Sequence, residues 1–321
     1  MREFDLLRHI YDGNRGLPTR VTIPPGDDMG AVRIGDQEVL VTVDQIADGV
    51  HFDLATMPLE RIARKAITRN LSDVAAMAAV PVGAVAAACL PGDMTQAQAT
   101  ELFDHMRRVA EQYDCPLFGG DVSVWPGRLL LSVTVLAKAD GIAPLRRNGA
   151  QVGDVICVTG RLGGSLHELD GHTHHLDFEP RLAIARKLAG NADTRPHCMI
   201  DLSDGLARDL GHLCRAAGVS AQVQAAALPV SSAAHRAAHA DHRDVWRHAV
   251  ADGEDYELCF TVSPRQAERS LPGEIDGVAI TEVGLVTPAN GDSRVMLDLL
   301  DGQKVDITDL GWEHGQVEIG K

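Results

Sequence analysis

The sequence predicts a protein of two domains in which helices and strands alternate. Its length of 321 residues corresponds to about two domains of ordinary size. Segments with apolar residues at helical spacing alternate with short β-type runs in both halves of the chain. A loop-like stretch around residues 139–152 separates the halves. We therefore predict one domain over residues 1–140 and a second over residues 141–321.

The most regular helical pattern of the first half lies between Pro58 and Val80. Its apolar residues recur with the period of an α-helix, and Pro58 suits a first turn because no backbone N–H is needed there. Two further amphipathic helices are predicted at residues 1–12 and 95–113. The predicted strands of this half cover residues 31–34, 38–43, 82–90, 115–118 and 129–138.

The second half is predicted to mix short strands with helices. Ser203 or Asp204 is suited to cap a helix that begins near Leu206. Other helices are expected at residues 181–188, 231–250 and 264–270. The predicted strands cover residues 154–159, 256–262, 278–285, 294–299 and 304–307.

Composition restricts the class of protein. The 45 acidic residues exceed the 30 basic ones and give a net charge of −15, which opposes non-specific nucleic-acid binding. The N-terminus lacks a signal-peptide pattern, and no apolar run is long enough to cross a membrane. The six cysteines form no C-x-x-C pair and mostly adjoin apolar residues, which is typical of buried thiols in a reducing compartment. We therefore expect a cytoplasmic protein that binds neither nucleic acid nor membrane.

The predicted helix from Pro58 to Val80 carries an acidic residue in an apolar pattern. Asn70 and Asp73 are three residues apart and share one side of that helix. A carboxylate in such surroundings needs a partner. One hypothesis is an ion pair between Asp73 and Arg69, one turn earlier. The other is that Asp73 meets acidic residues from elsewhere in the chain.

Acidic residues recur at five places, most of them beside glycine or serine. These are Asp27 with Asp28, Asp44, Asp73, Asp121, and Asp201 with Asp204. Most lie at predicted strand ends or loop starts, where side chains can converge. Carboxylates on loops suit Mg²⁺, an ion that protein carboxylates commonly bind together with substrate phosphates. Closely spaced carboxylates repel one another unless cations neutralise them. The pattern favours a site for several metal ions and a polyphosphate, and the alternative is a set of ordinary turns.

A histidine-rich segment lies within residues 167–178. Its histidines are His167, His172, His174 and His175. Such a segment can bind a transition metal, but its spacing matches no zinc pattern and no cysteine assists it. We expect a solvated loop.

Eight stretches together carry a family resemblance. They are PPGDDMGAV, VTVDQIADGVHF, KAITRNLSDVAAMAAVP, FGGDVS, RRNGAQVGDVICVTGRLGGS, MIDLSDGLARDLGHLC, DGEDYELCFTV and GWEH. The chain resembles the thiamine-monophosphate kinase family, part of an ATP-binding superfamily with aminoimidazole ribonucleotide synthetase and selenophosphate synthetase. The stretches occur in the family's order and span nearly the whole chain.

The resemblance implies a fold, a reaction and a set of ligands. The fold would be an N-terminal α/β domain, whose strands form a barrel across a homodimer, followed by a C-terminal α+β domain. The reaction would use ATP and several Mg²⁺ ions to phosphorylate thiamine monophosphate to thiamine diphosphate. The implied metal ligands are Asp28, Thr42, the Val43 carbonyl, Asp44, Asp73, Asp121, Asp201 and Asp204. Gly120, Asp121, Arg147 and Ser203 would contact ATP, His51, Glu254 and Trp312 would hold the acceptor, and Asp73, Asp121 and Arg147 would be catalytic.

The chain also departs from the family pattern. Ala251-Asp252-Gly253 replaces the more usual small-Gly-Gly before Glu254, Val43 stands where threonine is common, and the segment between Gly164 and Pro180 is short. These departures keep two alternatives open. One is a related ATP-dependent enzyme with another acceptor, such as an amide-activating synthetase. The other is a non-catalytic nucleotide-binding protein.

Overall fold

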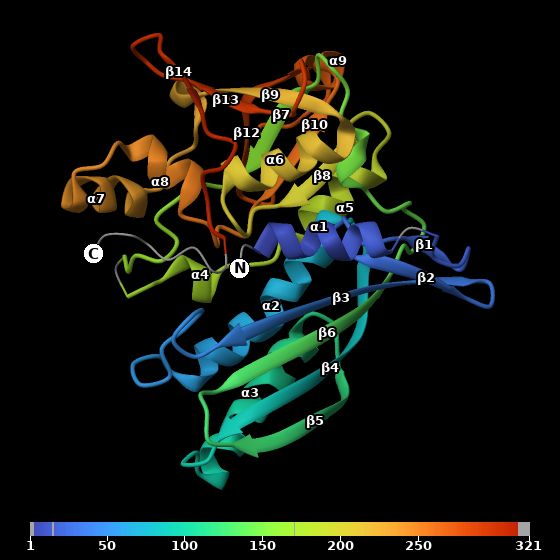
Figure 1. The fold of residues 1–321 in the computed structure, drawn as a ribbon, viewed down its shortest axis with the longest axis vertical. Helices are drawn as coiled ribbons and strands as arrows, with labels where there is room; N and C mark the ends of the chain where they lie inside the picture. Colours follow the sequence, from blue (N-terminus) through green and yellow to red (C-terminus); the bar gives the residue numbers. More distant parts are fainter. Residues whose placement is uncertain (1–2, 15, 170, 314–321) are drawn as a thin grey trace.

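The computed structural model describes residues 3–14, 16–169 and 171–313. Its strands form two sheets, one from residues 21–138 and one from residues 155–306 (Figure 1). The chain is therefore a mixed α/β protein, as predicted. The first sheet is open within the described residues, so a single copy of the chain contains no closed barrel.

The first sheet has six strands in the order β1-β2-β3-β6-β4-β5. All neighbours are antiparallel except β4 and β5, which run parallel. The strands are β1 Val21–Ile23, β2 Gly30–Ile34, β3 Gln37–Ala47, β4 Val80–Pro91, β5 Leu117–Trp125 and β6 Leu130–Lys138. Helices α2 (Leu59–Ala76) and α3 (Gln96–Gln112) bury their apolar faces against one side of this sheet. Helix α1 spans Glu3–Gly13.

The second sheet has the order β14-β13-β9-β12-β7-β10-β8, with β11 attached to β12. Its strands are β7 Val155–Thr159, β8 Cys198–Asp201, β9 Val219–Gln224, β10 Leu258–Val262, β11 Glu274–Ile275, β12 Val278–Pro288, β13 Val295–Asp298 and β14 Lys304–Asp306. Its helices are α4 His174–Asp177, α5 Leu182–Gly190, α6 Leu206–Ala217, α7 Ser232–Asp241, α8 Val245–Ala251 and α9 Pro264–Arg269, with 3₁₀ turns at Arg147–Gly149 and Ala225–Ala227.

Helix α2 connects the two sheets. Its middle packs into the core of the first sheet, where Leu71 is fully buried. Its C-terminal end, with Ala75 and Ala76, packs instead into a core shared with α5 and with Phe260 of β10. The small alanine side chains let the helix approach the second sheet closely, so α2 runs from one sheet to the other (Figure 1).

Three differences from the sequence prediction change the position of a predicted residue or the course of an element. Strand β3 continues beyond Asp44, so this residue lies inside a strand. Strand β5 contains Gly119-Gly120-Asp121, which we expected to follow a strand ending at residue 118. The glycines suit this strand because a Cβ on Gly120 would lie 1.9 Å from the Ala86 carbonyl oxygen. The predicted helix at 231–250 is divided into α7 and α8 at His242, whose φ is 61°.

The described cysteines have no disulfide partner, and all except the half-buried Cys89 are buried, as predicted. None of the helices in the described ranges combines the length and hydrophobicity of a membrane-spanning segment.

Candidate functional site

Three carboxylates from distant parts of the chain meet between the sheets. Asp28 lies on the loop between β1 and β2, Asp73 on α2, and Asp201 at the end of β8. One oxygen atom from each lies within 4.8 Å of the others. The predicted convergence of these acidic residues is therefore present in a single chain.

Short hydrogen bonds fix the cluster to the adjoining elements. The Thr42 hydroxyl on β3 donates to the Asp73 carboxylate. The Ser72 hydroxyl donates to Asp201 Oδ2 at 2.6 Å and joins α2 to β8. The Asp44 backbone N–H donates to Asn70 Oδ1 at 3.1 Å. The Asn-Leu-Ser-Asp sequence thus connects α2 to both sheets through its three polar side chains.

Of the two hypotheses for Asp73, the ion pair with Arg69 is not the one that the structure shows. Arg69 Nε instead lies 3.1 Å from Asp44 Oδ2, and its Nη1 donates to the Gln45 carbonyl oxygen at 3.2 Å. The guanidinium therefore neutralises the strand carboxylate of Asp44 and leaves Asp73 facing the other acidic residues.

The cluster carries more negative charge than its surroundings stabilise. Burial and the nearby charges of Asp44, Asp201 and Asp28 raise the pKa of Asp73 well above its ordinary value. Burial and the charge of Asp28 raise the pKa of Asp201 to about 8, although Ser72 and Arg147 act in the opposite direction. A group of carboxylates with raised pKa values holds protons or cations at neutral pH.

Arg147 supplies the main positive charge at this site. It lies in the 3₁₀ turn after the first sheet, and its Nη2 and Nε donate to the two oxygens of Asp28 at 2.8 and 3.2 Å. Arg146 Nε pairs with Asp27 Oδ2, and the Arg147 backbone N–H donates to Asp27 Oδ1 at 3.2 Å. A guanidinium can donate two parallel hydrogen bonds to a carboxylate or to a phosphate. Arg147 therefore places a guanidinium, a group that suits phosphate oxygens, beside the acidic cluster.

The donors at this cluster fit hydrated Mg²⁺. Asp28, Asp73 and Asp201 supply carboxylate oxygens, and Thr42 adds a hydroxyl oxygen beside Asp73. Mg²⁺ prefers such hard oxygen ligands and keeps several waters. A bound cation would remove the repulsion that raises the carboxyl pKa values, so these residues could hold Mg²⁺.

A second group of predicted residues lines a small cavity next to the cluster. The cavity has a volume of about 60 Å³, and its walls include His51, Ser203, Asp204, Glu254 and Trp312. Asp204 is close to the acidic cluster in sequence, because it follows Asp201 by three residues. Its loop is held by a hydrogen bond from its backbone N–H to the buried Asp209 Oδ2, at 3.0 Å. The structure thus brings the implied acceptor residues together with Ser203, the residue implied to contact ATP.

The Glu254 carboxylate lies between the ammonium group of a lysine and the ring of a histidine. Lys65 Nζ approaches its carboxylate at 2.7 Å, and His175 Nδ1 at 2.9 Å. Burial alone would raise its pKa, but the His175 hydrogen bond and the Lys65 charge lower the pKa of Glu254 to about 2. Burial lowers the pKa of Lys65 to about 8. Glu254 is therefore a fixed anion at the wall of the cavity.

The backbone around Glu254 is strained. Glu254 and Tyr256 have φ values of 54° and 49°, which residues other than glycine rarely adopt. A Cβ on Gly253 would lie 3.0 Å from the Ser203 carbonyl oxygen. Such strain persists where the surrounding structure imposes it, frequently at functional sites. Here it turns the Glu254 carboxylate toward Lys65.

Two residues of this site were missed in the sequence. Lys65 is fully buried on the apolar face of α2. In the sequence, a lysine at a core-facing position of the helical pattern was the signal that could have indicated a buried charge with a partner. His175 belongs to the segment predicted as a solvated loop, and that prediction is wrong here: His175 is buried, and His174 Nε2 contacts the Asp255 carbonyl oxygen at 2.7 Å. His167 and His172 are exposed, as predicted.

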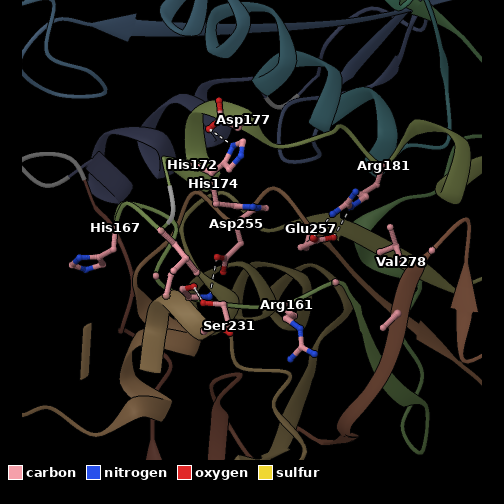
Figure 2. A pocket seen from close by; sticks show the side chains of 18 of the residues that line it. Arg161, His167, His172, His174, Asp177, Arg181, Ser231, Asp255, Glu257 and Val278 are labelled. Atoms are coloured by element: carbon pink, nitrogen blue, oxygen red, sulfur yellow. Dashed lines mark hydrogen bonds and ion pairs between the residues drawn. The ribbon is translucent and has the colours of Figure 1, made fainter. Parts of the chain in front are cut away.

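A larger pocket of about 760 Å³ lies beyond the Gly163-Gly164 turn (Figure 2). One wall carries Arg181, whose Nε donates to Glu257 Oε2 at 2.7 Å. None of the predicted site residues lines this pocket. It is therefore separate from the acidic cluster and from the cavity beside Glu254.

The remaining predicted residues lie apart from the cluster. Gly120 and Asp121 are on β5, and β6 and β4 separate this strand from Asp44 on β3. Three strand spacings correspond to about 14 Å. Val43, by contrast, lies on β3 between Thr42 and Asp44. Its side chain is 60% exposed, and the ligand implied there is its backbone carbonyl. Within one chain, Asp121 therefore does not join Asp28, Asp73 and Asp201.

Comparisons with known proteins agree with this geometry. A family model for the N-terminal domain of AIR synthase related proteins matches residues 26–139. The chain is 37% identical over 298 residues to the thiamine-monophosphate kinase of Rhodopirellula baltica, with 90% of each chain covered. It is 33% identical to that of Escherichia coli, with 97% of this chain and 98% of the other covered. A solved structure, AaThiL complexed with AMPPCP and TMP, has a TM-score of 0.80 at 27% identity and covers 98% of this chain and 97% of its own. The chain therefore belongs to the thiamine-monophosphate kinase family.

Proposed function

We propose that this protein transfers the γ-phosphoryl group of ATP to the phosphate of thiamine monophosphate, forming thiamine diphosphate and ADP. The observation that carries this proposal is the placement of a cation-binding cluster next to an anionic cavity with an aromatic wall. The cavity combines the fixed charge of Glu254 with the indole of Trp312. These groups suit a positively charged heterocycle with a phosphate tail. The family relatives named above have the same activity in their names.

The acceptor phosphate is already ionised, so the reaction needs no strong general base. In the proposed site Asp28, Asp73 and Asp201 hold Mg²⁺, which supplies charge neutralisation on the transferred phosphoryl group. Arg147 moves from Asp28 to a phosphate oxygen and stabilises the charge that develops there. His51, Glu254 and Trp312 orient the acceptor. Catalysis thus consists of positioning and electrostatics.

The activity itself is tested with purified protein, ATP, Mg²⁺ and thiamine monophosphate. We expect thiamine diphosphate and ADP in equal amounts. Turnover of amide-bearing acceptors in preference to thiamine monophosphate would overturn the proposal in favour of a related synthetase. ATP binding with no turnover of any acceptor would favour a non-catalytic protein.

We further propose that the active protein is a homodimer in which the open first sheets form a barrel. Strand β5 is an uncovered edge strand of nine residues, and its Phe118, Val122 and Val124 are 62%, 53% and 71% exposed. A long apolar edge tends to pair with another chain. A second copy is the natural cover, and it would bring another β5 with Asp121 to the assembly. The two-domain division at residue 140 is retained as part of this proposal, since the two sheets lie on either side of it.

Replacing Asp73 by asparagine removes one charge from the cluster with little change in shape. We expect Asp73→Asn to lower kcat by at least about 10²-fold while circular dichroism shows a folded protein, because the loss is that of a pre-positioned charged group. Asp104→Asn on α3, whose carboxylate is 43% exposed, serves as the control. A near-wild-type kcat for Asp73→Asn would remove Asp73 from the mechanism.

The raised carboxyl pKa values predict that Mg²⁺ binding depends on pH. Asp201, with its pKa of about 8, is largely protonated below that pH in the metal-free protein. Mg²⁺ must displace this proton, so its apparent affinity should rise as pH increases from 6.5 to 8.5. Without Mg²⁺ the folded state loses stability over the same range, because its carboxyl pKa is raised above the unfolded value. Calorimetry in buffers of different ionisation enthalpy measures the released proton, and an affinity independent of pH would contradict the assignment.

The charge of Glu254 is expected to serve acceptor binding. We predict that Glu254→Gln raises KM for thiamine monophosphate by about tenfold or more, with a smaller change in KM for ATP, since a hydrogen bond to a charged group contributes about 1.5–3 kcal/mol. Glu60→Gln on the exposed side of α2 is the matched control. Equal increases of both KM values would show that Glu254 acts through the fold and not through the acceptor.

The homodimer is tested at its proposed edge. Light scattering of the wild-type protein should give twice the mass of one chain, and Val124→Lys should shift the equilibrium towards monomer, because a charged side chain disfavours edge pairing. Leu300→Lys, at another exposed apolar residue (86%), should leave the mass unchanged. A monomeric wild-type protein, or a dimeric Val124→Lys variant, would refute the proposed interface.

A further inference from the structure

Two histidines and an aspartate converge beside the cavity that Glu254 lines, and the aspartate, Asp252, also lines that cavity. His167 lies on the loop after Gly163-Gly164, His248 is buried in α8, and Asp252 follows the end of that helix. One ligand atom from each lies within 4.8 Å of the others. We propose that His167, His248 and Asp252 form a binding site for one divalent transition-metal cation of the zinc class.

The spacing of His248 and Asp252, the two less exposed residues and here called the inner ligands, already fits a metal. His248 Nδ1 lies 3.1 Å from Asp252 Oδ1. In a tetrahedral zinc site with Zn–N of about 2.0 Å, neighbouring ligand atoms are about 3.3 Å apart. His167 is exposed, and its ring meets that of His248 edge-on with the centroids 6.3 Å apart. A rotation of this surface side chain brings a ring nitrogen to the third position and leaves the fourth to water.

The outer partners of the two inner ligands are also in place. The second ring nitrogen of His248, Nε2, lies 3.3 Å from Asp241 Oδ2. The Gly164 backbone N–H donates to Asp252 Oδ2 at 2.8 Å, which leaves Oδ1 for a cation. Histidine ligands of metals commonly donate their other N–H to a carboxylate, which fixes the ring and its tautomer. An ordinary surface ion pair needs neither of these arrangements.

The donor set distinguishes this place from the acidic cluster. Imidazole nitrogens suit zinc, nickel, copper and iron, whereas Asp28, Asp73 and Asp201 offer only oxygens and suit Mg²⁺. Arg243 and Arg247 lie in the adjoining cavity and would repel a cation. Each has an acidic partner, however: Arg243 Nε is 3.7 Å from Asp241, and Arg247 Nε is 4.0 Å from Asp244.

The other histidines of the 167–178 segment do not contribute. Figure 2 shows His167 apart from His172 and His174. His175 is committed to Lys65 and Glu254. The segment therefore supplies one ligand, and α8 with its C-terminal residue supplies the other two.

The experiment is a Co²⁺ titration of the tag-free, full-length protein in millimolar Mg²⁺, followed by the visible absorption of bound Co²⁺. We expect one Co²⁺ per chain, displaced by Zn²⁺. His167→Ala and Asp252→Asn should each weaken binding at least about tenfold, the lower bound for losing even an outer partner of a metal ligand. His172→Ala is the matched control, because that side chain is 80% exposed in the same segment and lies outside the cluster. It should bind Co²⁺ like the wild type.

Asp73→Asn separates the two sites, because it alters the acidic cluster and should leave Co²⁺ binding unchanged. Unchanged binding in both His167→Ala and Asp252→Asn would overturn the proposal, as would complete displacement of Co²⁺ by Mg²⁺. His248 and Asp252 would then be only a helix-end ion pair. Circular dichroism of each variant confirms that it is folded, and the measurement needs no enzymatic turnover.

Discussion

The repulsion among Asp28, Asp73 and Asp201 is the constraint on which the rest of the site depends. Three carboxylates whose oxygens lie within 4.8 Å cannot all remain ionised without compensating charge. The fold supplies only part of it: Arg147 pairs with Asp28, while Thr42 and Ser72 donate hydrogen bonds to the other two. The elements around the cluster thus hold the three groups together against their mutual repulsion, and the binding of a cation would relieve it. As the proposed cation site, the cluster would derive its affinity from an unfavourable ligand-free state.

Helix α2 can hold such a site because it is fixed from two sides. Leu71 is buried in the core of the first sheet, and Ala76 is buried in the core that α2 shares with α5 and β10. Ser72 and Asp73 lie between these two contacts and reach β8 and β3. About two turns earlier, Lys65 on the same helix contacts Glu254. The cation cluster and the acceptor cavity are therefore positioned by one rigid element, which suits a reaction that relies on alignment of two substrates.

The sequence predicted the parts of the site that local pattern determines. The helical period placed Asp73 on α2, and the strand-end positions of the acidic residues predicted their convergence. Such patterns do not determine pairings between distant segments. One hypothesis paired Arg69 with Asp73, one turn away, but the fold brings Arg69 to the strand carboxylate of Asp44. His175 was predicted to lie in a solvated loop, because local pattern does not reveal its contact with Lys65, 110 residues away. In β5, parallel pairing with β4 outweighed the glycine signal that indicated a strand end.

In the proposed mechanism, the pairing of Arg147 with Asp28 would link cation binding to nucleotide binding. In this structure both oxygens of Asp28 accept from Arg147, so the guanidinium cannot approach a phosphate without leaving a buried carboxylate uncompensated. A cation at the acidic cluster would take over that carboxylate and free Arg147 at the same moment. By reciprocity, a phosphate chain that engages Arg147 would leave Asp28 available and strengthen cation binding. Metal and nucleotide would then bind with positive coupling even where they share no direct contact, because one arginine exchanges between two partners of the same charge.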